Sequence, residues 1–204
     1  MNWQIVPLKK RDRDLCREAA EMLVEEFRAF WPNAWPTLKA AETEVDDALH
    51  SEKIAYAAVG EGGRLLGWIG GQPQYSGNVW ELHPLAVRKD AQGQGIGRSL
   101  VKRLEEEVRE RGGLTLWLGT DDEAGLTSIG GVDLYPGVLE KLAGVESQRG
   151  HPVRFYERLG FEVTGVVPDA NGLGRPDILM SKRVAEPLEG HVWGVDSNGE
   201  NNVA

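Results

Sequence analysis

The sequence predicts a single α/β domain, and the clearest indication is a strand, a glycine-rich turn and a helix that follow one another. Residues 79–87 form an extended, mostly apolar run that Pro84 interrupts. Residues 92–99, Gln-Gly-Gln-Gly-Ile-Gly-Arg-Ser, form a glycine-rich turn. The apolar residues that come next recur at the spacing of an amphipathic helix: Leu100, Val101, Leu104 and Val108. Further strands and helices are predicted on both sides of this unit.

The N-terminal part of the chain begins with a predicted strand over residues 3–8. Residues 15–30 keep their apolar side chains on one helical face, and Asp12 or Asp14 is placed to cap that helix. Two prolines just after Phe30 end it. We then expect a helix, a strand, a hairpin turn and two more strands, in that order: 37–50, 54–59, 60–64, 65–72 and 79–87.

The helix that follows the glycine-rich turn is predicted to end near Arg111, where two glycines stop it. Residues 121–150 contain acidic and glycine-rich turns and predict only a short helix, near 138–142. The other expected elements are a strand, a helix and two strands: 114–119, 152–159, 161–167 and 178–184. No linker divides residues 1–184, so we expect one domain followed by a polar tail over 185–204.

The composition is that of a soluble protein, with 41% hydrophobic and 27% charged residues and a formal net charge of −9. This charge argues against a nucleic-acid partner, because phosphate binding requires a basic surface, and it suits a cationic substrate. No apolar stretch is long enough to cross a membrane, and the N-terminus lacks a signal-peptide pattern. Cys16 is the single cysteine, so we expect no intrachain disulfide and a cytoplasmic location.

The glycine-rich turn directs several backbone N–H groups and the positive end of a helix dipole to one point, which is an arrangement that binds phosphate. A dinucleotide fingerprint requires a glycine where Arg98 stands, and a P-loop requires Gly-Lys-Ser/Thr, which residues 97–99 only approach. A third pattern, Gln/Arg-x-x-Gly-x-Gly/Ala, is fulfilled by Gln92, Gly95 and Gly97. A glycine-rich connection without a ligand is the remaining alternative.

The third pattern is the pyrophosphate loop of the GNAT acyltransferase superfamily, which this sequence resembles. Residues 155–161, Phe-Tyr-Glu-Arg-Leu-Gly-Phe, resemble a second GNAT signature. Further segments are similar, in family order, to those of the aminoglycoside 6′-N-acetyltransferases: 34–37, 80–85, 118–123, 151–152, 167–172 and 176–178. The resemblance covers about residues 31–184 and implies the GNAT fold, with a mixed central sheet that is splayed at the donor site and flanked by helices.

The resemblance also implies acetyl-CoA as the donor. The splayed strand, here Leu85, Ala86 and Val87, would offer its backbone to the pantetheine arm, and the N–H of Leu85 would hold the thioester carbonyl. Pro84 cannot donate to a strand ladder and suits a place where strand pairing is interrupted. The pyrophosphate would lie on the turn: Gln92, Gly93, Gln94, Gly95, Ile96, Gly97, Arg98 and Ser99.

Acetyl transfer to an amine benefits from a group that takes the amine's proton and a group that protonates the departing thiolate. Glu81 is a carboxylate within an apolar strand, and the resemblance places it at the acceptor amine; an outward-facing strand residue is the alternative. His83 lies on the same strand face and is a second candidate base. Tyr156 matches the GNAT general acid, although the Asn that often precedes this helix is Arg149 here.

The predicted acceptor segments are rich in carboxylates and aromatic rings, which suit the ammonium groups and sugar rings of an aminoglycoside. The resemblance implies substrate contacts from Trp31, Glu81, His83, Asp121, Asp122 and Asp177, with Trp35, Glu123 and Asp169 as further candidates. Each of these residues also has a plain explanation as a turn former, a cap or a core residue.

The four histidines lack the spacing of a metal site, and we expect no metal. The predicted function is therefore transfer of acetyl from acetyl-CoA to the 6′-amine of an aminoglycoside, with antibiotic resistance as its consequence. Two alternatives stay open: a different amine, such as a polyamine or an amino sugar, and a non-catalytic acyl-CoA-binding module. The resemblance also implies a homodimer, and we expect neither a membrane nor a nucleic-acid partner.

Overall fold

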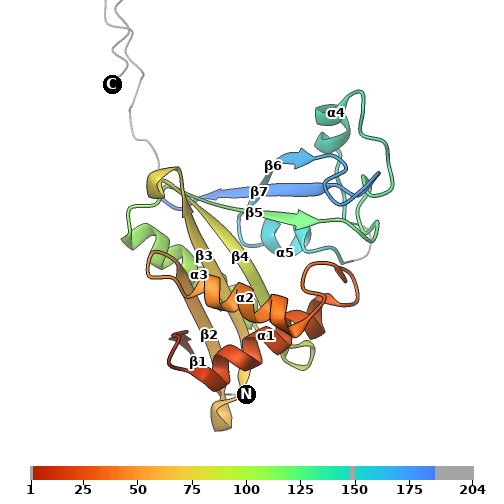
Figure 1. Cartoon of the computed structure of the whole chain (residues 1–204). Helices are drawn as coiled ribbons and strands as arrows, with labels where there is room; N and C mark the ends of the chain where they lie inside the picture. The colour runs from red at the N-terminus through yellow and green to blue at the C-terminus, as the bar shows by residue number, and fades with distance from the viewer. Residues whose placement is uncertain (1, 148–149, 187–204) are drawn as a thin grey trace, which may run out of the picture.

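The computed structural model describes residues 2–147 and 150–186 of the chain, so the polar tail expected over 185–204 lies almost wholly outside it. One seven-stranded sheet runs through these residues in the order β1-β2-β3-β4-β5-β7-β6 (Figure 1). Its strands are β1 (Trp3–Pro7), β2 (Ile54–Gly60), β3 (Leu65–Gln74), β4 (Val79–Val87), β5 (Thr115–Asp121), β6 (Glu162–Val167) and β7 (Asp177–Arg183). Only β4 and β5 pair in parallel, so the sheet is mixed, as predicted.

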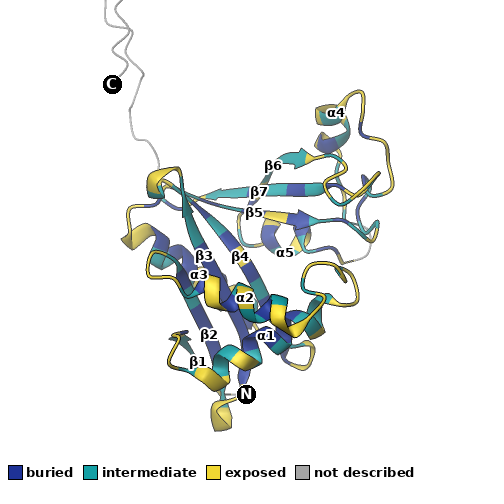
Figure 2. Cartoon of the chain, viewed as in Figure 1, coloured by how far each residue is buried: buried dark blue, intermediate teal, exposed yellow. Residues whose placement is uncertain are grey.

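Helices cover both faces of the N-terminal half of the sheet (Figure 1). Trp68 of β3 belongs to a hydrophobic cluster with α1 (Arg13–Phe27) and α2 (Leu38–Ala48), whereas its neighbour Ile69 belongs to a cluster with α3 (Ile96–Glu110). Since successive strand residues point to opposite faces, α1 and α2 lie on one side and α3 on the other. Figure 2 shows the buried residues of β2, β3 and β4 between these two layers.

The sheet is splayed between β4 and β5. These two strands pair only over their first three residues, Val79–Glu81 with Thr115–Trp117, and then diverge, as Figure 1 shows. On its other side, β4 pairs with β3 along most of its length, but the register shifts opposite His83 and Pro84. The predicted interruption of strand pairing at Pro84 is therefore confirmed, and the divergence leaves one edge of β4 without a partner strand.

Most of the predicted elements are present, with shifted ends. The helix predicted over 15–30 is α1, which already ends at Phe27. The side chain of Thr37 caps α2 by accepting the N–H of Ala40 (3.2 Å), whereas Asp12 stands at the N-cap position of α1 without a side-chain hydrogen bond. Thus α1 begins without the side-chain cap that the sequence suggested, and α2 begins with one.

The C-terminal half carries two short helices beside β5, β7 and β6 (Figure 1). The short helix predicted near 138–142 is α4 (Val138–Ala143), and the helix predicted over 152–159 is α5, which covers only Val153–Glu157. None of the helices within the described residues is both long and apolar enough to cross a membrane.

Candidate active site

The glycine turn, as we call residues 92–99, leads directly into α3. Gly93 and Gly95 have φ angles of 75° and 83°, in the left-handed region that glycine adopts without strain. Among the described residues, no acceptor is found for the backbone N–H groups from Gly93 to Arg98, and the helical pattern begins where Ser99 donates to the carbonyl of Gly95 (3.0 Å). These free donors at a helix N-terminus form an anion site that suits a pyrophosphate.

The side chains of the glycine turn fix its position. Gln92 Nε2 donates to the carbonyl of Val87 (3.0 Å), which ties the start of the turn to the end of β4. A Cβ atom at Gly97 would lie 3.3 Å from the ring of Phe155, so the absence of a side chain there lets α3 approach α5 closely. The turn is thus anchored to β4 at one end and packed against α5 at the other.

The unpaired edge of β4 offers backbone groups to a ligand. The side chains of Leu85 and Val87 pack against the cluster on the α3 side, and Ala86 is buried in the cluster on the other side. These three side chains are therefore occupied by the core. What remains for a ligand is the backbone along the edge that faces β5, which can pair with an extended group as an added strand would.

A cavity of about 340 Å³ lies where β4 and β5 diverge. Its wall includes Trp31 and Trp35 from the loop that follows α1, Leu85 from β4, Asp121 from the end of β5 and Tyr156 from α5. The structure thus brings together candidates that were predicted from four separate parts of the chain. The cavity adjoins the unpaired edge of β4, so a ligand on that edge would reach into it.

Tyr156 is buried in the wall of this cavity, with 8% of its surface exposed. Burial raises the pKa of its phenol above the ordinary value, since an ionised phenolate would lose its hydration. Within the described residues, the hydroxyl group of Tyr156 has no hydrogen-bond partner. Tyr156 therefore keeps its proton at neutral pH, as a general acid must before it acts.

Glu81 is held by two neutral amides of the neighbouring strand. Gln72 and Gln74 of β3 each donate to its Oε2 at 2.7 Å, and Gln74 in turn accepts the indole N–H of Trp117 (3.2 Å). The carboxylate has no cationic partner within the described residues, and its Oε1 carries none of these bonds. Glu81 does not itself line the cavity, but it is oriented beside it and has one oxygen free for a cationic group.

Asp121 and Asp177 lie directly opposite each other on β5 and β7. Burial, the charge of Asp121 and the charge of Glu81 raise the pKa of Asp177 to about 7, against the lowering effect of a backbone hydrogen bond at Thr120. Asp177 Oδ1 is buried without a hydrogen-bond partner in the described part of the chain. The charges of Asp121 and Glu81 therefore both act on Asp177, and a polycation at this end of the sheet would relieve the repulsion.

His83 lines the cavity but is engaged with α2. Its Nε2 lies 3.6 Å from Oε1 of Glu44, and its ring lies 5.8 Å from the ring of Trp35. Burial alone would lower the pKa of His83, but the interaction with Glu44 and the charges of Glu44 and Glu81 raise it above the ordinary value. An imidazole that is paired with a carboxylate of α2 is less available to a substrate amine, so Glu81 is the stronger of the two candidates.

The main chain of Asp121 contacts Trp31 of the cavity wall and His151 behind it. Its carbonyl accepts the indole N–H of Trp31 (2.9 Å) and lies 3.0 Å from Nε2 of His151. A carbonyl can only accept, so Nε2 of His151 carries the proton, and burial lowers the pKa of this histidine. The side chain of Asp121 also accepts a hydrogen bond from Asn171. Trp31 is thus locked against β5.

Asp122 does not reach the cavity, and we correct its predicted role. It is 1% exposed, and its two oxygens accept the N–H groups of Leu126 (2.6 Å) and Thr127 (2.9 Å) and the Thr127 hydroxyl (2.6 Å). Both oxygens of the Asp122 carboxylate are therefore engaged in hydrogen bonds within this loop. Asp169 has a similar role, because its side chain accepts the N–H of Gly174 (2.7 Å), and Glu123 does not line the cavity.

Several neighbours of the site were missed by sequence reasoning: Glu44, Gln72, Gln74, Asn171 and Phe27. Gln72 and Gln74 did leave a signal, because polar residues two apart in a strand share a face. Glu44 and Asn171 left none, since a carboxylate on a helix and an amide in a loop are ordinary. Within residues 2–147 and 150–186, no group of three potential metal-ligating side chains is found.

The comparisons with known proteins agree with this geometry. A family model described as the Acetyltransferase (GNAT) family matches residues 20–130, more than half of the chain. The chain therefore belongs to the GNAT acetyltransferase family, and its mixed, splayed sheet is the GNAT fold. No curated protein sequence matches the chain.

Solved structures similar to the chain include three aminoglycoside 6′-N-acetyltransferases. One, a complex with coenzyme A, is 38% identical with a TM-score of 0.83, and the match covers 90% of this chain and 98% of that one. The enzyme from Enterococcus faecium is 36% identical with a TM-score of 0.80, over the same shares. An aminoglycoside 6′-acetyltransferase of type Ii is 34% identical with a TM-score of 0.68, over 90% and 99%. Family and complex together support acetyl-CoA as the donor.

Proposed function

We propose that the chain transfers an acetyl group from acetyl-CoA to the 6′-amine of an aminoglycoside. The observation that carries this proposal is the group formed by Glu81, Asp121 and Asp177 beside a cavity walled by Trp31 and Trp35. Carboxylates and aromatic faces are what a polycationic sugar needs. The similarity to three 6′-N-acetyltransferases, over nearly the whole of both chains, supports the same acceptor.

Acetyl-CoA supplies the activated acetyl group as a thioester. In this proposal the N–H groups of the glycine turn hold its pyrophosphate, and the edge of β4 from Leu85 to Val87 pairs with its pantetheine arm. The backbone N–H of Leu85 orients the carbonyl oxygen. Glu81 holds the acceptor amine and takes its proton, directly or through water, while Tyr156 donates the proton that the leaving sulfur takes up.

Thiol release from acetyl-CoA against a panel of acceptors tests the proposal. We expect turnover with kanamycin, which has a 6′-amine, and none with an aminoglycoside that carries a 6′-hydroxyl. Turnover with spermidine or a lysine peptide alone would keep the family and the donor but reject the acceptor. Coenzyme A binding without turnover of any amine would favour an acyl-CoA-binding module instead.

Glu81→Gln tests the proposed base. The amide keeps the shape and the bonding capacity of the side chain but cannot take a proton, so kcat/KM for the aminoglycoside should fall by at least about a hundred-fold. The matched control is Glu61→Gln in the exposed turn between β2 and β3, which should leave kcat/KM unchanged. If Glu81→Gln retains full kcat/KM across the pH range, Glu81 is not the base.

Three further points belong to the same proposal. Acetylation would confer aminoglycoside resistance on a cell that makes the protein. A homodimer is proposed from the resemblance to the family, and a monomer in sedimentation at micromolar concentration would contradict it. A cytoplasmic location is proposed because the chain has one cysteine and no possible intrachain disulfide.

A further inference from the structure

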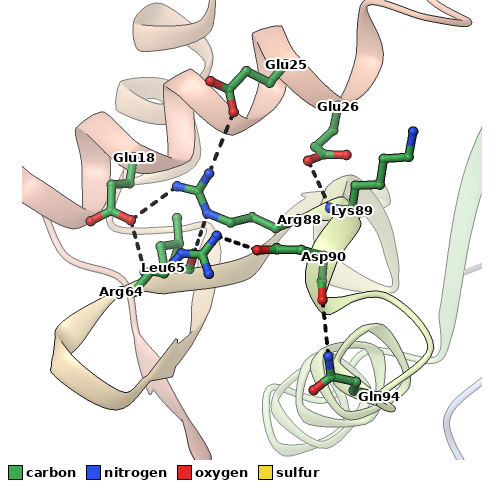
Figure 3. A network of polar contacts seen from close by, with 9 residues as sticks. All are labelled: Glu18, Glu25, Glu26, Arg64, Leu65, Arg88, Lys89, Asp90 and Gln94. Atoms are coloured by element: carbon green, nitrogen blue, oxygen red, sulfur yellow. Dashed lines mark hydrogen bonds and ion pairs between the residues drawn. The ribbon is translucent and has the colours of Figure 1, made fainter. Parts of the chain in front are cut away.

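The segment between β4 and the glycine turn is attached to α1 by polar contacts (Figure 3). The backbone N–H of Lys89, the second residue after β4, donates to Oε1 of Glu26 at 3.0 Å. This bond joins the last turn of α1 to the main chain three residues before the glycine turn. No comparable bond between α1 and the turn itself is found in the described part of the chain, so residues 88 and 89 are where the helix holds this segment.

Arg88 strengthens the same attachment. Its guanidinium lies between two carboxylates of α1, with Nη2 3.3 Å from Glu18 and Nη1 3.6 Å from Glu25, and its Nε donates to the carbonyl of Leu65 (2.7 Å). The Arg88 side chain is 15% exposed. Glu18 also accepts the N–H of Leu65 (3.0 Å). Arg88 therefore faces α1 and β3, as Figure 3 shows, and its charge is engaged by Glu18 and Glu25 of α1.

Asp90, two residues after Arg88, is held by contacts with residues outside α1. Asp90 receives Arg64 Nη2 at 2.8 Å, and its backbone carbonyl accepts Nε2 of Gln94 (3.3 Å), while Ala91 is buried in the core. Anchors thus run without a gap from Arg88 to Gln92, and the free N–H groups begin at Gly93. The direction in which those free groups point is set by the anchored segment that precedes them.

We propose that Glu26, supported by the Arg88 ion pairs to Glu18 and Glu25, positions the glycine turn for the donor. This inference rests on the proposed donor site at residues 92–99. In it, Glu26 is a positioning residue that acts through the backbone of Lys89, and Arg88 serves the fold of the turn and does not contact the phosphates. Phe27, the next residue of α1, lines the acceptor cavity, so one helix supports both binding sites.

Electrostatics alone predict the opposite effect of removing Glu26 on the affinity for coenzyme A. Coenzyme A is a polyanion, and Glu26 places a negative charge on the segment that leads to its pyrophosphate site. If charge were the only role of Glu26, its removal would tighten coenzyme A binding. If Glu26 holds the turn in place through its hydrogen bond, its removal weakens binding. The direction of the change in Kd distinguishes the two.

Isothermal titration of the whole protein with coenzyme A tests the inference. We expect Glu26→Ala to raise the Kd roughly three- to ten-fold, the size of one ordinary hydrogen bond lost at a partly exposed site. Glu26→Gln keeps a carbonyl oxygen that accepts the Lys89 N–H, so its Kd should stay near the wild-type value. Glu21→Ala is the matched control, because Glu21 is a carboxylate of α1 whose one ion pair within the described residues is with Arg17 at 3.9 Å.

The outcomes separate the inference from the donor site itself. Coenzyme A binding by Glu26→Ala that is as tight as wild type, or tighter, overturns the inference, and so does an equal loss in Glu26→Gln. A merely structural role predicts a lower Tm with unchanged Kd, whereas the inference predicts a raised Kd in Glu26→Ala and an unchanged Kd in Glu21→Ala, whatever the change in Tm. Failure of the wild-type protein to bind coenzyme A would instead reject the donor site.

Discussion

Asp177 shows how a single residue is tuned by its surroundings. Its carboxyl group lies against Gly119, where a Cβ atom would stand only 2.5 Å from Oδ2, and it faces Asp121 across the strand pair. Burial and the nearby charges of Asp121 and Glu81 raise its pKa from 3.8 to about 7. A carboxyl group that is costly to ionise without a substrate becomes a good partner for an ammonium group with one.

This raised pKa gives a stability prediction with a definite sign. Between about pH 4 and about pH 7, native Asp177 keeps a proton that the unfolded chain releases, so the free energy of unfolding falls as the pH rises through this window. Asp177→Asn removes this pH-dependent fall in the free energy of unfolding, because the amide does not titrate. The variant should therefore gain stability relative to wild type as the pH rises towards 7, with no further gain above it.

Urea unfolding at about pH 4 and about pH 8 measures the effect. The control is Asp14→Asn on the exposed side of α1, whose stability difference from wild type should show no such rise. A difference between Asp177→Asn and wild type that is the same at both pH values would contradict the prediction. Because the same carboxylate is proposed to bind substrate, the variant should also have a raised KM for the aminoglycoside.

At the scale of the element, the glycine turn depends on backbone conformation. Gly95, at the N-cap of α3, has a φ of 83° and open space where a Cβ would stand, so a larger residue is disfavoured by conformation and not by a clash. Gly62 in the β2–β3 turn is matched to it, with a φ of 74° and equally open space. The two sites therefore differ in location but not in the kind of strain.

Gly95→Val and Gly62→Val should each lower the unfolding free energy by about 1–2 kcal/mol. Only Gly95→Val should also raise the KM for acetyl-CoA strongly, because it displaces the free N–H groups of the turn. Steady-state kinetics with acetyl-CoA varied, beside thermal unfolding of both variants, measure this. Equal acetyl-CoA KM values for the two variants would mean that the donor loop is wrongly assigned.

At the scale of the whole molecule, the net charge of −9 acts on substrates before they bind. A cationic aminoglycoside is attracted by this field, and added salt screens the attraction, since the Debye length falls from about 10 Å at 0.1 M to about 3 Å at 1 M. We expect kcat/KM for the aminoglycoside to fall as sodium chloride is raised. The same parameter for anionic acetyl-CoA should not fall, which provides an internal control. An acceptor kcat/KM that is independent of salt would show that the charge plays no part.

Much of the fold could be predicted because its elements follow local rules. The strands and α3 repeat apolar residues at periods that one segment carries by itself, and the glycine turn has a pattern that needs no distant partner. Helix ends were less predictable: α1 stops at Phe27 and α5 covers only Val153–Glu157, since helix ends depend on the chain they pack against. The prediction left residues 121–150 open; at the start of this range Asp122 holds Leu126 and Thr127 by side-chain hydrogen bonds, which follow no periodic pattern.

The candidate site divides in the same way. Residue type and spacing were enough to predict the strand that carries Glu81, the turn that carries Gly95 and the carboxylates that suit a cation. Folding had to bring side chains together before it was evident that Gln72 and Gln74 orient Glu81, that Asp177 is hard to ionise, and that Arg88 faces α1. These depend on which side chains meet after folding, and hydrogen bonds, burial and charge act over a few ångströms in space regardless of distance along the chain.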